Sequence, residues 1–173
     1  MKYTAAVITM SDKGSRGERI DTAGPALCRL LEEAGWEIAY TKIIPDDFEK
    51  IKAELISCCD NLEVCLVATT GGTGFSPRDT TPEATKAIIE RETPGIGEAM
   101  RLESLKITPM GCLSRGAAGL RGKTLIINCP GSEKAARECF SAVLPALKHG
   151  IDTLRGTSAD CAVLHQSAHH DHN

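Results

Sequence analysis

The sequence predicts a single doubly wound α/β domain, in which one mostly parallel sheet carries helices on both of its faces. Two observations support this prediction. Short apolar runs alternate with segments whose apolar residues recur every three or four positions, as in strands alternating with amphipathic helices. The connections between them are short, which favours parallel strands joined by crossover helices. A chain of 173 residues can bury one good core, whereas two domains would each have a marginal one.

The predicted strands are short apolar runs bounded by turn residues. The first, AAVITM, is apolar enough throughout to fill the centre of a parallel sheet. The second ends at a Pro-Asp-Asp break, the third leads into a glycine-rich turn, and the last ends in Cys-Pro-Gly-Ser. These strands cover residues 5–10, 37–44, 63–69 and 123–128.

The helices between the strands are predicted from apolar residues spaced three and four apart. The first ends at Gly35, and the second begins after the Pro-Asp-Asp break. A third is expected to begin at Thr81, whose hydroxyl would cap it ahead of a proline and an early acid. Pro145 should kink or interrupt the last helix. The apolar faces of the other helices include residues 27–34, 48–59, 95–105 and 136–147.

The remaining segments divide the chain into a domain and a tail. Residues 1–156 are predicted to form the domain, with a loop rich in glycine and alanine over residues 110–122. Residues 157–173 form a polar tail with several histidines, which we expect to be flexible. These histidines could bind Ni²⁺, Zn²⁺ or Cu²⁺ weakly, but such a tract seldom forms a specific site without a scaffold.

The composition argues against several classes of partner. A net charge of −3 provides no sign of a basic face for nucleic acid, and 3% aromatic residues leave few platforms for stacking bases. No apolar run approaches the roughly 20 residues that span a membrane. The eight cysteines contain no C-x-x-C pair, which favours reduced thiols over disulfides or a zinc site. We therefore expect a cytoplasmic protein without a nucleic-acid or membrane partner.

The glycine-rich segment after the third strand carries the strongest functional signal. It reads TTGGTGFSPRD over residues 69–79. Glycines let the backbone approach a ligand closely, and exposed N–H groups at such a turn suit an anion. The segment lies at the carboxyl end of a predicted parallel strand, where open α/β sheets bind ligands. It therefore predicts a loop that handles phosphate.

Three other predicted loops should lie beside this one, because loops that follow parallel strands meet at one edge of the sheet. For Asp12 or Asp46 alone, helix capping or turn formation would be the better explanation. The convergent set suits a phosphorylated ligand with Mg²⁺, which takes one or two carboxylates together with phosphate oxygens. The four loops are Ser11-Asp12, Pro45-Asp46-Asp47, Thr70–Asp79 and Asn128–Ser132.

Several familiar motifs are missing from the sequence. It contains neither the G-x-x-x-x-G-K-[ST] of P-loop NTPases nor the G-x-S-x-G of α/β-hydrolases. Residues 71–74 lack the third glycine of a dinucleotide fingerprint, and no acid follows a further strand at the required distance. The glycine turn therefore belongs to a different class of phosphate loop.

Five stretches of the sequence match one known family together: TTGGTGFSPRDTTPEAT (69–85), RETPG (91–95), ESLKITP (103–109), LSR (113–115) and GKTLIINCPGS (122–132). They resemble the MogA-type molybdopterin adenylyltransferases, a family that includes the G domains of gephyrin and of its plant counterpart. The resemblance runs from about Thr4 to Arg155.

The resemblance implies a trimeric enzyme that uses Mg²⁺ to transfer AMP from ATP to the terminal phosphate of molybdopterin. Pyrophosphate is released, and a molybdate-inserting protein is an expected partner. By position, Asp46 and Asp79 match the two aspartates that the family needs for catalysis and metal handling. The residues expected to bind nucleotide or molybdopterin are Ser11, Asp12, Asp21, Thr70, Gly71, Gly72, Thr73, Gly74, Ser76, Arg78, Ser114, Arg115, Asn128, Pro130, Gly131 and Ser132.

The chemistry of adenylyl transfer agrees with these roles. A phosphate nucleophile is already anionic near neutral pH, so catalysis is mostly alignment and neutralisation of charge. Carboxylates would repel phosphate directly, which is why Asp46 and Asp79 are expected to hold Mg²⁺. Backbone N–H groups and Arg78 would supply the positive potential.

One departure and two alternatives accompany this prediction. Ala23 stands where the family pattern has serine, so Ala23 is not counted as a site residue, although Thr22 could supply a hydroxyl one position early. A non-catalytic molybdopterin-binding or scaffold module of the MoaB type is one alternative. It often lacks the aspartate of Pro-Arg-Asp, so Asp79 favours the enzyme. A nucleotide pyrophosphatase related to competence-damage proteins is the other.

Overall fold

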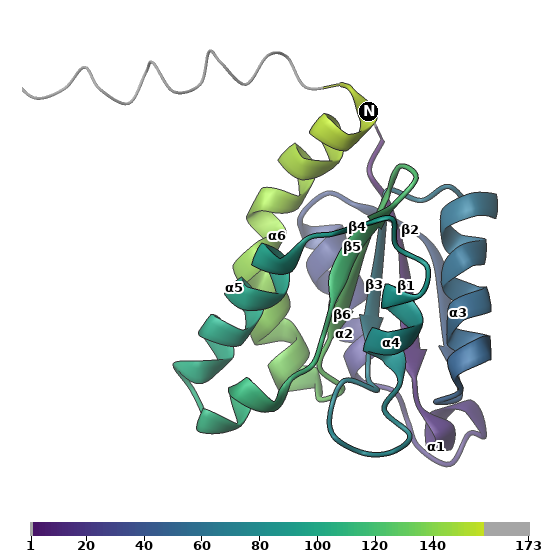
Figure 1. Cartoon of the computed structure of the whole chain (residues 1–173), viewed down its shortest axis with the longest axis vertical. Coiled ribbons are helices and arrows are strands. Elements are labelled where there is room, and N and C mark those ends of the chain that lie inside the picture. The colour runs from purple at the N-terminus through teal and green to yellow at the C-terminus, as the bar shows by residue number, and fades with distance from the viewer. Residues whose placement is uncertain (1, 158–173) are drawn as a thin grey trace, which may run out of the picture.

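The computed structural model describes residues 2–157, which form an α/β fold around one sheet (Figure 1). Across these residues the sheet has six strands in the order β2-β1-β3-β6-β5-β4. They are β1 (Thr4–Met10), β2 (Glu37–Ile44), β3 (Leu66–Thr70), β4 (Arg91–Glu92), β5 (Ala118–Arg121) and β6 (Thr124–Cys129). Strands β2, β1, β3 and β6 are parallel, whereas β5 is antiparallel to both β6 and β4. The prediction of a mostly parallel sheet is confirmed.

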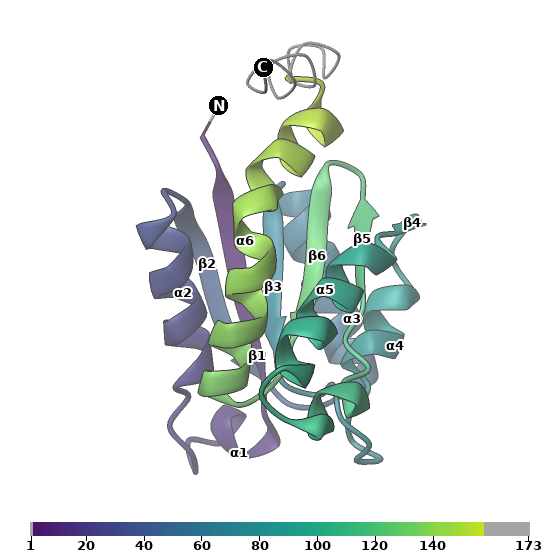
Figure 2. The ribbon, with the colours of Figure 1, turned by 90° about the vertical axis from the view of Figure 1, so that its left-hand side faces the viewer.

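Helices cover both faces of this sheet. Figure 2 shows α2, α6 and α5 in front of one face, with α3 and α4 behind it. The helices are α1 (Asp12–Ser15), α2 (Ala23–Glu33), α3 (Phe48–Ile56), α4 (Thr81–Lys86), α5 (Pro94–Leu105) and α6 (Glu133–Arg155). A π-helical turn spans Ser57–Asn61, and a 3-10 turn spans Pro109–Leu113.

The apolar core consists of two layers, one on each side of the sheet. Neighbouring residues of β1 belong to different layers: Val7 packs in the layer of Phe140 from α6, and Ile8 packs in the layer of Ile51 from α3. Because side chains of a strand alternate between its faces, a central strand covered on both sides must be apolar at every position. This requirement explains the continuous apolar run from which the first strand was predicted.

The loop predicted over residues 110–122 is wrong in part, since the segment contains most of the 3-10 turn and all of β5. Arg121 pairs with Thr124 of β6 across a hairpin whose turn holds Gly122 at φ +52. The sequence of β5, AGLR, has no apolar alternation of its own. It forms a strand because the edge of β6 is available for pairing. The four residues of β5 do not indicate this pairing by themselves.

Two predictions about helix geometry also need correction. The N-cap of α4 is Thr80 rather than Thr81, and neither hydroxyl caps the helix. Pro145 does not interrupt α6, which runs over 23 residues. The missing proline N–H frees the carbonyl of Ser141, and both residues lie on the exposed side of the helix, where water can hydrate that carbonyl.

The described part of the chain ends just beyond α6, whose C-cap is Gly156 at φ +70. Between residues 2 and 157, no helix is long and apolar enough to cross a membrane. The predicted tail lies outside the described residues from position 158 onward, and so do the histidines considered as weak metal ligands.

Candidate active site

The functional candidates gather at the edge where the parallel strands end. Thr9 of β1 lies opposite Thr70 of β3, and Thr70 lies opposite Cys129 of β6. The last residues of β1 and β2, Met10 and Ile44, are also partners. The four loops that follow these strands therefore begin side by side, as the topology argument predicts.

A cavity of about 380 Å³ opens at this edge between the loops and the starts of α2 and α6. The predicted site residues that line it are Ser11, Asp21, Asp46, Thr70, Gly71, Gly72, Asp79, Gly131 and Ser132. The predicted residues outside its walls are Asp12, Thr73, Gly74, Ser76, Arg78, Ser114, Arg115, Asn128 and Pro130.

The glycine turn requires glycine at two successive positions. Gly71 and Gly72 have φ values of +97 and +65, which side chains rarely tolerate. A Cβ on Gly71 would collide with the carbonyl oxygen of Met10, and one on Gly72 would collide with the hydroxyl of Thr81. Gly131 packs against this turn, since a Cβ there would lie 3.2 Å from the Cα of Gly71. The two loops thus form adjoining backbone walls of the cavity.

Asp46 is fixed by reciprocal contacts with the loop after β1. The N–H of Asp12 donates to Asp46 Oδ2 at 2.9 Å, and the N–H of Asp46 donates to Asp12 Oδ1 at 3.1 Å. Arg78 donates from Nε to Asp12 Oδ2 at 3.0 Å and from Nη2 to Asp12 Oδ1 at 2.9 Å. The guanidinium expected to meet phosphate is therefore engaged with a carboxylate in this structure.

These contacts give the aspartates different acidities. Burial raises the pKa of Asp46, and the nearby charges of Asp12 and Asp79 raise it further, against the lowering effect of the Asp12 N–H. The hydrogen bonds from Arg78 lower the pKa of Asp12. The partly buried Asp46 carboxylate therefore lies in a region of negative potential that a bound cation would relieve.

Asp79 is held within its own turn. Its Oδ2 accepts a hydrogen bond from the N–H of Ser76 at 3.0 Å, and its N–H donates to the carbonyl of Ser76 at 2.9 Å. A Cβ on Gly74 would lie only 2.9 Å from Asp79 Oδ2. Among the described residues, nothing donates to Asp79 Oδ1 or to Asp46 Oδ1, and both side chains line the cavity.

Arg115 holds the glycine turn from outside the cavity. Its N–H donates to Thr73 O at 2.9 Å, its Nε to Gly74 O at 2.7 Å and its Nη2 to Asp79 O at 2.6 Å. Its remaining side-chain nitrogen, Nη1, pairs with Glu83 at the start of α4. Arg115 thus holds the backbone of residues 73–79 in place, and the ligand contact that the resemblance implies for it stays a prediction.

Asn128 is likewise committed to protein partners. It is 2% exposed, and its Nδ2 donates to the hydroxyls of Thr69 at 3.1 Å and Thr85 at 2.9 Å. Its Oδ1 accepts from the N–H of Ala117 at 3.2 Å. The carbonyl of Pro130 accepts from the Thr70 hydroxyl at 2.6 Å. The polar groups of the β6 end therefore tie β3, β6 and α4 together.

Sequence reasoning missed some of the cavity walls in the loop between β1 and α2. Arg19 and Ile20 line the cavity, as do Gly14, Thr22 and Ala23, the last of which had been set aside as a site residue. Arg19 has no ion pair or hydrogen bond from its side chain within residues 2–157. No spacing or composition signal in this polar loop distinguishes Arg19 from Arg16, which pairs with Glu18.

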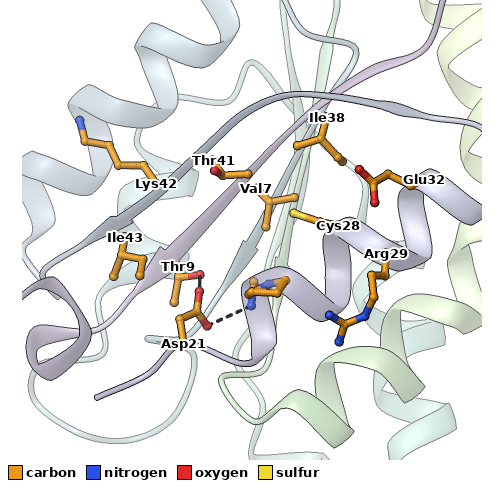
Figure 3. A pocket seen from close by; sticks show the side chains of 12 residues that line it. Val7, Thr9, Asp21, Cys28, Arg29, Glu32, Ile38, Thr41, Lys42 and Ile43 are labelled. Atoms are coloured by element: carbon orange, nitrogen blue, oxygen red, sulfur yellow. Dashed lines mark hydrogen bonds between the residues drawn. The ribbon is translucent and has the colours of Figure 1, made fainter. Parts of the chain in front are cut away.

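A second cavity of about 710 Å³ adjoins the first between α2 and the edge strand β2 (Figure 3). The two cavities share Thr9 and Asp21. Asp21 accepts from the Thr9 hydroxyl at 2.6 Å and from the N–H of Gly24 at 3.0 Å. The other lining residues are Val7, Gly24, Pro25, Cys28, Arg29, Glu32, Ile38, Thr41, Lys42 and Ile43. Asp21 therefore lies at the boundary between the two spaces.

The donor set is compatible with Mg²⁺ bound together with a phosphate ligand. Asp46 Oδ1 and Asp79 Oδ1 accept no hydrogen bonds from the described residues, and both aspartates line the same cavity. Residues 2–157 contain no cluster of three or more His, Cys, Asp or Glu residues suited to a metal ion. Two carboxylates fit Mg²⁺ because this ion usually takes its other ligands from water and phosphate.

The strand-end cavity, the glycine turn and the pair of aspartates are compatible with an α/β protein that binds a phosphorylated ligand. Residues 6–149 match the sequence profile of a family described as “Probable molybdopterin binding domain”. Because the match covers most of the chain, the chain belongs to this molybdopterin-binding family.

Individual relatives make the likeness more specific. The chain is 44% identical over 153 residues to the molybdopterin adenylyltransferase of Helicobacter pylori J99, covering 87% of this chain and 86% of that protein. It is 40% identical over 152 residues to the molybdopterin adenylyltransferase of Escherichia coli K12, covering 84% of this chain and 77% of that protein. The structure of the molybdopterin biosynthesis enzyme MoaB from Thermus thermophilus matches with a TM-score of 0.85 and 47% identity, covering 89% of this chain and 97% of that one. The predicted resemblance is confirmed.

Proposed function

We propose that this chain adenylylates molybdopterin in molybdenum cofactor biosynthesis. AMP passes from ATP to the terminal phosphate of molybdopterin, and pyrophosphate leaves. The observation that carries the proposal is the placement of Asp46 and Asp79 in one cavity with the Gly71-Gly72 turn. This arrangement occurs in a chain that is 40% and 44% identical to proteins named molybdopterin adenylyltransferase.

Backbone groups on part of the cavity wall would stabilise phosphate, whereas the carboxylates on the rest of the wall would need a cation. Thr22 and Ala23 at the start of α2, and Gly131 and Ser132 at the start of α6, line the cavity. The positive ends of both helix dipoles therefore lie at the cavity, where they stabilise an anion. The N–H groups of Gly72 and Gly131 donate to no acceptor among residues 2–157, so they are available to phosphate oxygens.

The reaction requires alignment more than proton transfer. An oxygen of the molybdopterin phosphate forms a bond to the α-phosphorus of ATP, and the bond from that phosphorus to pyrophosphate breaks. The attacking phosphate is anionic near neutral pH, so no side chain needs to act as a strong base. Helix N-termini, turn amides and Arg19 would hold the phosphates in line and offset their charge.

Asp46 and Asp79 are proposed to hold Mg²⁺ through their Oδ1 atoms, which accept no hydrogen bond from the described residues. Bound there, Mg²⁺ would neutralise charge on the reacting phosphates. Reciprocal contacts with Asp12 orient the Asp46 carboxylate, and Ser76 orients that of Asp79. Each aspartate thus has one oxygen fixed by backbone and the other free for the cation.

The decisive experiment incubates the purified chain with molybdopterin and Mg-ATP and follows adenylylated molybdopterin and pyrophosphate together. We expect both products in equal amounts, and only when molybdopterin is present. Molybdopterin binding without AMP transfer would contradict the enzyme and favour the non-catalytic MoaB-type module. Pyrophosphate or nucleotide cleavage without molybdopterin would favour the pyrophosphatase.

We further propose that the enzyme acts as a homotrimer in the cytoplasm and passes its product to a molybdate-inserting protein. Self-association is supported by a set of large apolar residues, 42% to 67% exposed, on the outer side of α5 and the following turn. They are Leu102, Leu105, Ile107, Met110 and Leu113. Sedimentation equilibrium should give three times the chain mass, and a monomer would contradict the trimer without affecting the assignment of the reaction.

A further inference from the structure

Thr81 carries a polar group that neither the fold nor the site described above uses. The residue is 0% exposed at the start of α4, and its hydroxyl has no hydrogen-bond partner among residues 2–157. A buried hydroxyl without a partner costs stability, and valine would fill nearly the same space without that cost. Because the hydroxyl does not cap α4 either, its presence calls for another explanation.

The hydroxyl lies beside the proposed cation site. The N–H of Thr81 donates to the carbonyl of Gly72 at 3.2 Å, so α4 starts directly against the glycine turn. A Cβ built on Gly72 would collide with Thr81 Oγ1 and lie 3.2 Å from Asp46 Oδ1. Both oxygens therefore lie next to the position that a Cβ at Gly72 would take.

The two oxygens are complementary. Thr81 Oγ1 has a proton to donate, whereas Asp46 Oδ1 accepts no hydrogen bond from the described chain. Asp46 Oδ2 is already held by the N–H of Asp12 at 2.9 Å. A donor at Oδ1 would fix the rotation of the carboxylate plane, while the second lone pair of that oxygen stays available to a cation.

We propose that Thr81 is a positioning residue for the cation site: its hydroxyl donates to Asp46 Oδ1 when cation and phosphate ligand are bound, and so orients that carboxylate toward the cation. This role rests on the proposed function only in taking Asp46 as a cation ligand. The role explains why a buried threonine stands at this position although its hydroxyl has no partner among residues 2–157.

The test compares Thr81→Val, Thr81→Ser and wild type in two measurements without turnover. The first is binding of Mn²⁺, as a substitute for Mg²⁺, with α,β-methylene-ATP, followed by the electron paramagnetic resonance signal of free Mn²⁺. Loss of a group that orients a metal ligand typically weakens metal binding about 10-fold or more. We expect that loss in Thr81→Val, and near wild-type affinity in Thr81→Ser, which keeps the donor.

The second measurement is thermal unfolding without metal or nucleotide, where Thr81→Val should unfold at the wild-type temperature or above it. Thr93→Val is the matched control. Thr93 also has a buried hydroxyl that finds no partner in the described part of the chain, at the N-cap of α5 rather than beside Asp46. The Thr93→Val variant should show the same change in unfolding temperature as Thr81→Val. Its affinity for Mn²⁺ should be that of wild type.

Wild-type Mn²⁺ affinity in Thr81→Val, or equal weakening in Thr81→Ser and Thr81→Val, would overturn the role of Thr81. So would a wild-type protein that binds no Mn²⁺ with the nucleotide analogue, which would also remove Mg²⁺ from the proposed function. If the affinities shift as expected but wild type transfers no AMP to molybdopterin, only the proposed reaction fails.

Discussion

Two groups of predicted site residues differ in where their polar atoms point. Asp46 and Asp79 each have one carboxylate oxygen fixed by backbone N–H and another without a protein donor, and both line the cavity. Arg115 and Asn128 direct their side-chain polar groups to protein partners and do not line it. The first group is placed to meet ligand, whereas the second holds the walls in position.

This difference follows from what the glycine turn needs. Successive positive φ values at Gly71 and Gly72 make the turn unable to use a regular hydrogen-bond ladder. The carbonyls of Thr73 and Gly74 are satisfied by Arg115 instead. A family motif therefore combines ligand-binding residues with residues that hold their backbone, and substitutions should separate the two groups.

The largest separation is expected for Asp79→Asn. Asparagine can still accept from the Ser76 N–H, so the turn and molybdopterin binding should remain, while the charge that holds the cation is lost. We expect kcat to fall about 100-fold or more, with little change in unfolding temperature. Steady-state kinetics and a molybdopterin binding titration measure this.

The control for Asp79→Asn is Asp47→Asn. Asp47 follows Asp46 in the sequence and caps α3. Asparagine is as good a cap as aspartate, so the control should keep both activity and stability. Wild-type turnover in Asp79→Asn would show that Asp79 only supports its own turn.

Asn128→Ala should show the opposite pattern. It removes three hydrogen bonds and leaves the buried hydroxyls of Thr69 and Thr85 without their donor. We expect the free energy of unfolding to fall by about 2 kcal/mol, with kcat retained at temperatures where the variant is folded. Denaturant titration beside kinetics tests this, with the exposed Asn61→Ala as the control. A loss of kcat without loss of stability would return Asn128 to the ligand-binding group.

The sequence predicts features that have a local signal better than features that depend on how distant elements pack. The parallel strands and their loops follow from apolar runs and breaks, which are local signals, and the resemblance supplies Asp46 and Asp79. The strand β5 depends on pairing with β6, so its own AGLR sequence carries no signal. The position of α4 decides whether the Asn128 side chain can bind ligand or instead donates to Thr85. No local sequence pattern indicates where α4 packs.

Asp46→Asn should gain stability and lose cation binding. Because burial and neighbouring carboxylates raise its pKa, the ionised form of Asp46 is disfavoured in the folded protein, and this penalty is present above that pKa. At pH 7 the variant should be more stable by about 0.5 kcal/mol, allowing for partial exposure. The gain should shrink as the pH falls and the wild-type carboxyl takes up its proton. Unfolding titrations from pH 7 to pH 4 measure this, and a gain that grows toward low pH would contradict the raised pKa.

Arg19→Gln tests the smallest effect, in a cavity wall that sequence reasoning missed. Arg19 lines the cavity, and its side chain has no ion pair with the described residues, whereas Arg78 is engaged by Asp12. If Arg19 attracts the phosphates from this exposed position, its loss should weaken ATP binding about 2-fold at low salt, and less at high salt because of screening. Arg16→Gln removes a neighbouring arginine that lies outside the cavity walls and pairs with Glu18, so it should leave ATP affinity unchanged. Equal effects of the two substitutions would mean that only the net charge of the loop matters, and the positive potential for phosphate would then come from the turn amides and the starts of α2 and α6.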